Sequence, residues 1–223
     1  MILYHGSEQI IEQPIWGKGN LRNDYGRGFY CTEEEDLAKE WACSNNKDGF
    51  ANKYDVDLEG LKILYLNSAE YTLLNWLAVL TQNRTYWENS TVSAMAKKYI
   101  AENFSIDIST YDVVIGYRAD DSYFSFAQDF VSGAISYRQL GEAMHLGKLG
   151  EQIVLISANA FERIQYVSSG FAEANIYYKK KIERDKLARK AYRKTRNEEL
   201  KPDELLVTDT IREEMKNDDP RLR

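Results

Sequence analysis

Two short segments near the start of the chain combine residue types that could bind a nucleotide. Residues 4–7 read YHGS, and residues 25–32 read YGRGFYCT. Glycine lets a backbone approach a ligand closely because it has no Cβ, and an aromatic ring offers a flat face for stacking. An imidazole and a hydroxyl add hydrogen-bonding groups. A pocket for a nucleotide that ends in a flat heteroaromatic ring needs these residue types.

The two segments resemble the first two motifs of the His-Tyr-Glu class of ADP-ribosyltransferases, which includes diphtheria toxin and the poly(ADP-ribose) polymerases. A later segment, residues 150–155 (GEQIVL), strengthens the resemblance to a bacterial branch of this class that carries Gln where Glu is usual. The resemblance extends over residues 2–167. It implies a split β-sandwich fold and NAD⁺ as the substrate.

The resemblance also implies roles for individual residues in binding NAD⁺. His5 would hydrogen-bond the ribose on the adenosine side. The backbone of Gly6 would hold the nicotinamide carboxamide, and the hydroxyl of Ser7 would assist. Tyr30 would stack on the nicotinamide ring, and Trp41 occupies the position of a second ring wall.

The phosphates of NAD⁺ require positive charge and a close backbone approach. Arg22 or Arg27 could neutralise the pyrophosphate, because a guanidinium group matches phosphate geometry. Gly28 would keep the backbone close to the ligand.

By the same resemblance, the third catalytic position, where Glu is usual, falls on Gln152. Its amide can accept a hydrogen bond from a ribose 2′-hydroxyl, but it can neither carry a full negative charge nor act as a base. This favours transfer of a single ADP-ribose over chain elongation. Glu151 should point to the opposite face of the strand. We expect Asp120 or Asp121, in a loop after a buried strand, to supply the missing charge or to activate the acceptor.

Each of these residues also has a purely structural interpretation. Asp120 and Asp121 could simply begin a helix. Tyr30 and Trp41 could be core aromatics, and Gln152 an ordinary strand residue. His5 after a strand could be structural, and the Gly-Arg-Gly sequence only a tight turn.

Composition limits the class of protein. The chain has 223 residues, 43 % hydrophobic and 13 % aromatic, which predicts a globular protein with a substantial core. The two cysteines do not make a disulfide framework, so we expect a reducing, cytoplasmic setting. No apolar run approaches the length of a membrane span. With two histidines, no zinc-ligand spacing exists.

Charge is segregated along the chain. The net charge is -6, yet residues 179–201 hold eleven Lys and Arg against four Asp and Glu. Such a basic segment could dock on the acidic body of the chain, bind an acidic partner, or contact nucleic acid.

Hydrophobic periodicity predicts an α+β fold with two small sheets around a cleft, because strands and helices do not alternate regularly. We expect an ADP-ribosyltransferase-like domain over residues 1–174 and a charged helical extension over 175–223. Strands are expected at residues 2–4, 28–31, 52–57, 61–66, 111–116, 152–157 and 162–168. Helices are expected after an N-cap at Thr32 and at residues 68–82, 93–103, 122–130, 136–146 and 175–197.

The resemblance thus implies an NAD-dependent mono-ADP-ribosyltransferase that modifies a protein or a nucleic-acid acceptor. By resemblance it could be the toxin of a toxin-antitoxin or phage-defence system, with a small antitoxin as its partner. The alternative, motivated by Gln152, is a catalytically degenerate module that binds NAD, ADP-ribose or a partner.

Overall fold

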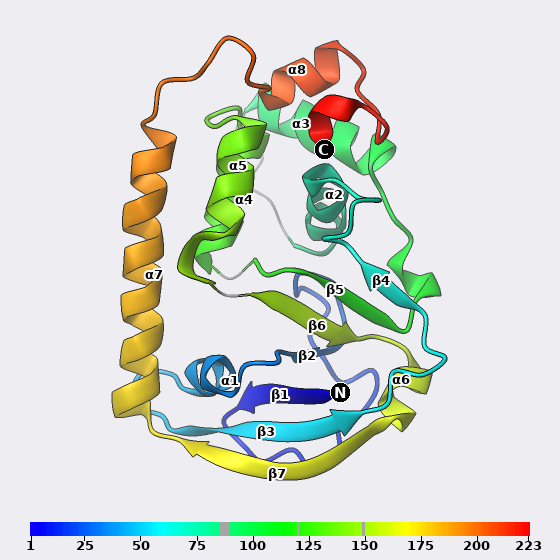
Figure 1. Cartoon of the computed structure of the whole chain (residues 1–223), viewed down its shortest axis with the longest axis vertical. Helices are drawn as coiled ribbons and strands as arrows, with labels where there is room; N and C mark the ends of the chain where they lie inside the picture. The colour runs from blue at the N-terminus through cyan, green and yellow to red at the C-terminus, as the bar shows by residue number, and fades with distance from the viewer. Residues whose placement is uncertain (85–89, 120, 149) are drawn as a thin grey trace.

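The computed structural model describes residues 1–84, 90–119, 121–148 and 150–223. In this part of the chain two sheets are stacked, with helices beside and above them (Figure 1). The first sheet has the order β1-β3-β7, and the second has the order β2-β6-β5-β4. The strands are β1 (Ile2–Ser7), β2 (Phe29–Cys31), β3 (Gly49–Val56), β4 (Ile63–Tyr65), β5 (Val113–Tyr117), β6 (Glu151–Leu155) and β7 (Ile164–Ala172).

The two sheets meet where β1 passes the end of β2. The Tyr4 amide donates to the Thr32 carbonyl at 2.8 Å, and the Thr32 amide donates back to the Tyr4 carbonyl at 2.9 Å. This bridge brings His5 of the first sheet beside the strand that carries Tyr30. Buried side chains from both sheets fill the space between them, among them Leu3, Phe29, Tyr54, Val113 and Ile153. The α+β class predicted from the sequence is therefore confirmed.

Helices cover the sheets on several sides. Their bounds are α1 (Glu35–Ala42), α2 (Leu73–Asn83), α3 (Thr91–Asn103), α4 (Asp121–Val131), α5 (Tyr137–Met144), α6 (Ala158–Glu162), α7 (Ala174–Arg196) and α8 (Val207–Arg212). The larger core surrounds α2, which is mostly buried and carries the fully buried Trp76. This core holds the helical half of the molecule together and anchors the second sheet from above.

Several predicted bounds need correction; the helix expected from residue 68, for example, begins at Leu73. Thr32 does not cap α1, which begins later, at Glu35. The Thr32 hydroxyl instead accepts a hydrogen bond from the Glu34 amide at 3.2 Å, in the turn before the helix. The strand expected from residue 162 begins at Ile164, because Ser157 caps the short helix α6 by accepting from the Ala160 amide.

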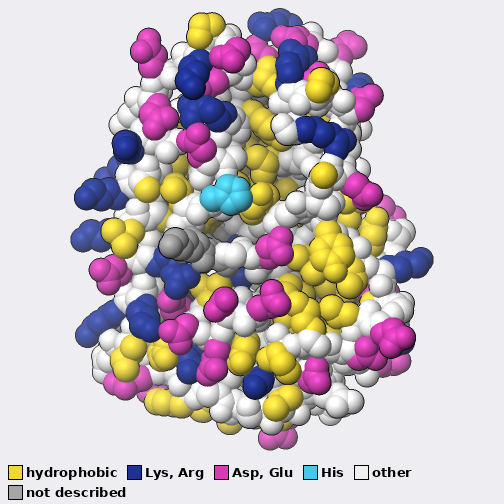
Figure 2. Space-filling model, viewed as in Figure 1, with side chains coloured by type: hydrophobic (Ala, Val, Ile, Leu, Met, Phe, Trp, Pro, Cys, Tyr) yellow, Lys and Arg dark blue, Asp and Glu magenta, His cyan; other side chains and the backbone are white. Residues whose placement is uncertain are grey.

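The C-terminal part of the chain packs onto the body. Helix α7 runs along one side of the molecule, and basic side chains mark that side (Figures 1 and 2). It docks through ion pairs, including Lys180 with Asp36 at 3.0 Å and Arg184 with Glu40 at 2.5 Å. Farther along, Leu222 is buried in the same core as Trp76. Docking on the chain's own acidic residues is thus the alternative that the structure shows for the basic segment.

None of the helices in the described ranges combines the length and the apolar character needed to cross a membrane.

Candidate functional site

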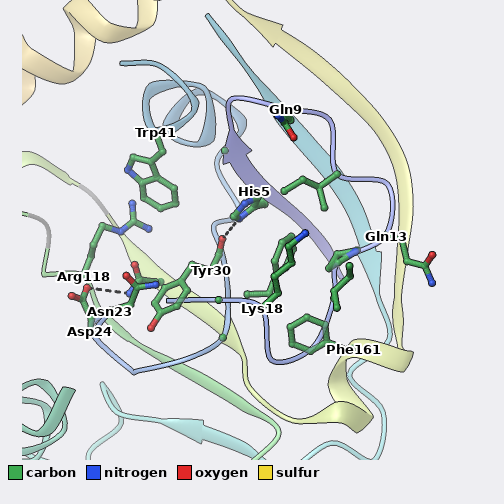
Figure 3. Close-up of a pocket in the computed structure, with 18 of the residues that line it drawn as sticks. His5, Gln9, Gln13, Lys18, Asn23, Asp24, Tyr30, Trp41, Arg118 and Phe161 are labelled. Carbon is green, nitrogen blue, oxygen red and sulfur yellow. Dashed lines mark hydrogen bonds between the residues drawn. The ribbon is translucent and has the colours of Figure 1, made fainter. Parts of the chain in front are cut away.

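A cavity of about 520 Å³ opens where the two sheets meet (Figure 3). Its walls come from β1, from the loop that joins β1 to β2, from β2 itself, from α1 and from the start of β6. Single residues that follow α2 and β5 also line it. Residues predicted from the sequence that line it are His5, Gly6, Gly28, Tyr30, Trp41 and Gln152. The fold therefore gathers side chains from both sheets and from widely separated parts of the chain around one hollow.

His5 is held in one tautomer. Its Nδ1 lies 2.7 Å from the carbonyl oxygen of Tyr30, and a carbonyl oxygen only accepts, so Nδ1 carries the proton. The ring also stacks on Phe29 with centroids 4.2 Å apart. Burial lowers the pKa of His5 below its usual value. The imidazole is therefore neutral near pH 7, and its Nε2 is free of a proton and suited to accept a hydrogen bond from a hydroxyl.

Tyr30 presents its ring while its hydroxyl is engaged by its own loop. The hydroxyl donates to the Gly26 carbonyl at 2.6 Å and accepts from the Tyr25 amide at 3.1 Å. Burial raises the pKa of Tyr30 well above its usual value, so the phenol stays neutral. This environment suits a stacking surface held in place at its far end and does not suit a proton donor.

Trp41 forms a second aromatic wall. The guanidinium of Arg118 lies over its ring, with Cζ 3.5 Å from the centroid, and both side chains line the cavity (Figure 3). One Arg118 amino group also donates to the Glu151 carbonyl at 3.3 Å. An aromatic face and a positive charge are thus presented together, an arrangement that suits a phosphate next to a ring.

The two glycines are required by packing. A Cβ on Gly6 would overlap the Ala38 carbonyl oxygen of α1 and lie 2.8 Å from the Ala42 amide nitrogen. A Cβ on Gly28 would lie 2.5 Å from Val154 Cγ1. Both residues line the cavity, but the close approach that excludes a side chain is to the protein's own helix and strand. The ligand-based argument made from the sequence is therefore not needed to explain them.

Three predicted binding residues do not reach the cavity. Ser7 uses its hydroxyl to hold the next loop, donating to the Gln9 carbonyl and accepting from Asn52 Nδ2 at 3.1 Å. Arg22 and Arg27 lie exposed in the surface loop before β2, outside the lining of the cavity.

The positive charges that do line the cavity are Lys18, Arg84 and Arg118. Sequence reasoning missed all three, because no motif marks them. Lys18 belongs to the long loop after β1, whereas Arg84 and Arg118 directly follow α2 and β5. Their proximity arises only from the tertiary fold.

Asp24 is the most informative residue that the sequence did not single out. It is 4 % exposed, although it lines the cavity. It accepts hydrogen bonds from Arg84 Nε at 2.8 Å, from the Ala119 amide at 2.9 Å and from Gln152 Nε2 at 3.3 Å. Burial raises the pKa of this carboxyl, and the charge of Arg84 and the hydrogen bonds oppose the rise. Its place directly before the glycine-rich segment was the available signal.

The strand β6 separates its first two side chains as predicted. Gln152 is 6 % exposed and faces Asp24. Glu151 is exposed, and its carboxylate accepts from Asn67 Nδ2 at 2.9 Å. The amide, and not the neighbouring carboxylate, therefore belongs to the cavity.

The structure describes only part of the predicted acidic loop at residues 120–121. Asp120 lies outside the described residues, and of Asp121 only the backbone at the start of α4 is described. Within the described residues the carboxylate that lines the cavity is that of Asp24.

The fold and the site together define an α+β protein with a cavity between two sheets that presents aromatic, amide and cationic groups. Residues 1–166 match a family described as "Protein of unknown function (DUF3990)", and the chain belongs to this family. No curated protein and no solved structure matches the chain. Every residue that lines the cavity falls inside the matched range, whereas α7 lies beyond it.

Proposed function

We propose that this protein is an NAD⁺-dependent mono-ADP-ribosyltransferase that modifies a protein or a nucleic-acid acceptor. The observation that supports the proposal is the meeting of His5, Tyr30 and Gln152, from three separate strands, around one cavity. These are the residues on which the resemblance to the His-Tyr-Glu class rests. The proposal would not survive if the three side chains were packed into separate interiors.

The geometry suits cleavage of the bond between nicotinamide and ribose. The bond breaks with its electron pair going to the nicotinamide nitrogen, which becomes neutral, and the sugar passes through an oxocarbenium-like state. The acceptor then forms a bond to the sugar carbon and loses its proton to water. Little covalent help is needed, so catalysis depends on positioning and electrostatics.

Each part of the cavity has a role in this scheme. Tyr30 would stack on the nicotinamide ring, and Trp41, whose ring carries the Arg118 guanidinium, would border it. The unprotonated Nε2 of His5 would accept a hydrogen bond from a ribose hydroxyl. Lys18 and Arg118 would face the pyrophosphate, in place of Arg22 and Arg27, which lie outside the cavity.

A second candidate function is binding of NAD⁺ or ADP-ribose without turnover. The amide at Gln152 supports it, because the strand position that carries a carboxylate in the His-Tyr-Glu class is uncharged here. Tight binding of both ligands without nicotinamide release would select this function over the first.

Transfer can be tested with NAD⁺ labelled in its adenylate part, added to a bacterial lysate together with the purified protein. Wild type should attach label to macromolecules, and His5→Ala should not. Protease or nuclease digestion of the labelled fraction then identifies the acceptor as protein or nucleic acid. If wild type transfers no label and neither NAD⁺ nor ADP-ribose raises its melting temperature, both candidate functions are wrong.

A further inference from the structure

Asp24 and Gln152 form a pair that none of the predicted roles explains. We propose that Asp24 is a positioning residue: it turns the Gln152 amide so that the carbonyl oxygen is presented to the cavity, and it supplies the negative charge that this strand position lacks. The inference deepens the proposed function and rests on it for the catalytic consequence. The pairing itself can be tested without NAD⁺.

The orientation of the amide follows from hydrogen-bonding chemistry. Both oxygens of Asp24 already act as acceptors, Oδ1 from Arg84 and Oδ2 from the Ala119 amide. The group of Gln152 that lies 3.3 Å from Oδ2 must therefore be the NH₂. The carbonyl oxygen of the same planar amide then points away from Asp24. An amide turned in this way can accept a hydrogen bond from a ribose 2′-hydroxyl, the one function that Gln152 could share with a glutamate.

Asp24 is itself fixed from several directions. Arg84 contacts Oδ1 through Nε at 2.8 Å and through Nη2 at 2.7 Å, and the Ala119 amide donates to Oδ2 at 2.9 Å. Arg84 also donates to the Ala119 carbonyl at 2.9 Å. The loop before β2, the end of α2 and the end of β5 thus converge on one carboxylate, which in turn fixes a side chain on β6.

The pair also explains why an amide is needed at Gln152. A glutamate there would place a second carboxylate about as close to Asp24 as the present amide nitrogen, in a site where both side chains are almost fully buried. Two carboxylates that share a site cannot both ionise easily, so one of their pKa values rises strongly. The carboxylate of this site therefore resides in the loop before β2, and the strand carries its hydrogen-bonding partner.

Other charged or titratable groups surround the pair in the described residues. Arg84 contacts the carboxylate directly, and Lys18 and Arg118 line the same cavity. Burial raises the pKa values of Tyr25 and Tyr30, so both phenols stay neutral. His5 lines the same cavity, and its lowered pKa keeps it neutral near pH 7. If a variant of the pair shows a pH effect between pH 5 and pH 8 that wild type lacks, the effect can therefore be attributed to the substituted residues.

The test moves the carboxylate from position 24 to position 152 and measures thermal unfolding at pH 5 and pH 8. Gln152→Glu should lower the melting temperature more at pH 8 than at pH 5. The folded pKa of the new pair lies above its unfolded value, so stability is lost as the pH rises. Asp24→Asn combined with Gln152→Glu leaves a single carboxylate in the site, so it should restore part of the loss at pH 8. Glu151→Gln, on the opposite face of β6, is the matched control and should show neither effect.

Activity supplies the second measurement. Asp24→Asn should reduce nicotinamide release on the order of 10²-fold, the effect typical of a displaced catalytic group, while the KM for NAD⁺ changes little. The double variant should be more active than either single variant, a gain that a merely structural role for Asp24 would not give.

The two levels of the argument fail separately. If the stability coupling is present but no variant releases nicotinamide, the pairing stands and the proposed enzymatic function is wrong. If wild type releases nicotinamide while Gln152→Glu is as stable and as active as wild type at pH 8, the pairing is overturned. It is also overturned if the two substitutions are simply additive in melting temperature.

Discussion

Two buried carboxylates, each paired with an arginine, serve different parts of this molecule. Asp24 and Glu40 are 4 % and 2 % exposed, and each has a guanidinium nitrogen within 2.8 Å. Asp24 also receives a backbone amide and the Gln152 side chain, and it lines the cavity between the sheets. Glu40 lies on α1 and receives Arg184 of α7.

The difference shows that one type of interaction, a buried carboxylate paired with an arginine, can position a functional group or hold a helix against the rest of the protein. A buried pair is weak evidence of net stability, because desolvation offsets much of the attraction. The additional donors around Asp24 are what would be expected where position matters. Within the described residues Glu40 receives one side-chain hydrogen bond, from Arg184 of α7, as expected of a contact that holds α7 against the body.

The largest effect should come from Gly6→Ala, which disturbs both regions together. Gly6 lines the cavity, and its added Cβ would be forced into the backbone of α1, the helix that carries Glu40. Because backbone cannot yield as a side chain can, we expect a loss of about 3 kcal/mol or more in the free energy of unfolding. Chemical denaturation would measure it.

The matched control is Gly141→Ala in α5, where the new Cβ would meet only Leu73 Cδ1 at 3.5 Å. Alanine favours a helix over glycine, so this variant should gain up to about 1 kcal/mol. Equal effects of the two substitutions would mean that α1 does not lie tightly over β1.

Arg84→Ala should affect the cavity and leave the Glu40–Arg184 ion pair intact. It leaves Asp24 buried without its cationic partner but with two other donors, so we expect a loss of about 3 kcal/mol, the low end for a broken buried pair. It should also reduce the stabilisation that NAD⁺ or ADP-ribose gives, because Arg84 lines the cavity and fixes Asp24 there. Melting temperatures with and without each ligand would show both effects. Full ligand stabilisation in a folded Arg84→Ala variant would contradict the account of the site.

Arg184→Ala is the corresponding change at the contact between α1 and α7. It leaves Glu40 without the partner at 2.5 Å, so we expect a loss of about 3 kcal/mol with ligand stabilisation retained. Lys180→Ala removes the neighbouring pair with Asp36, in which both side chains are largely exposed, and should cost less than about 1 kcal/mol. A larger loss from Lys180→Ala than from Arg184→Ala would show that burial does not decide the strength of this contact.

The smallest effect concerns pH. Burial raises the folded pKa of both Asp24 and Glu40 above its usual value. The folded state then binds more protons than the unfolded state between the two values, so stability falls as the pH rises through this window. Glu40→Gln should flatten its share of the fall, as measured by denaturation between pH 4 and pH 8. A steeper profile in the variant would mean that Arg184 dominates and lowers the pKa of Glu40.

Local sequence patterns predicted an element well where its own residues determine its structure. The β-branched run of β5 and the long charged helix α7 lie close to the positions expected from the sequence. The short helices α6 and α8 were not expected, because a few residues carry little periodicity. Their positions depend on caps and on packing against the rest of the chain.

The site divides in the same way. His5, Tyr30 and Gln152 were found because motifs mark them, and the structure places all three at the cavity. No motif marks Arg84, and Asp24, which lies directly before the glycine-rich segment, makes its contacts with residues far away in the sequence. The role of Gly6 was assigned to a ligand, because the sequence does not show that α1 lies over β1.

Nicotinamide release from NAD⁺ by the purified protein tests the central claim most directly. Three proteins should be compared: wild type, Tyr30→Ala in the cavity, and Tyr65→Ala at an exposed position on β4. We predict release by wild type and Tyr65→Ala, and none by Tyr30→Ala. Equal release by all three proteins, or none by wild type, would contradict the assignment of this cavity as the site of NAD⁺ cleavage.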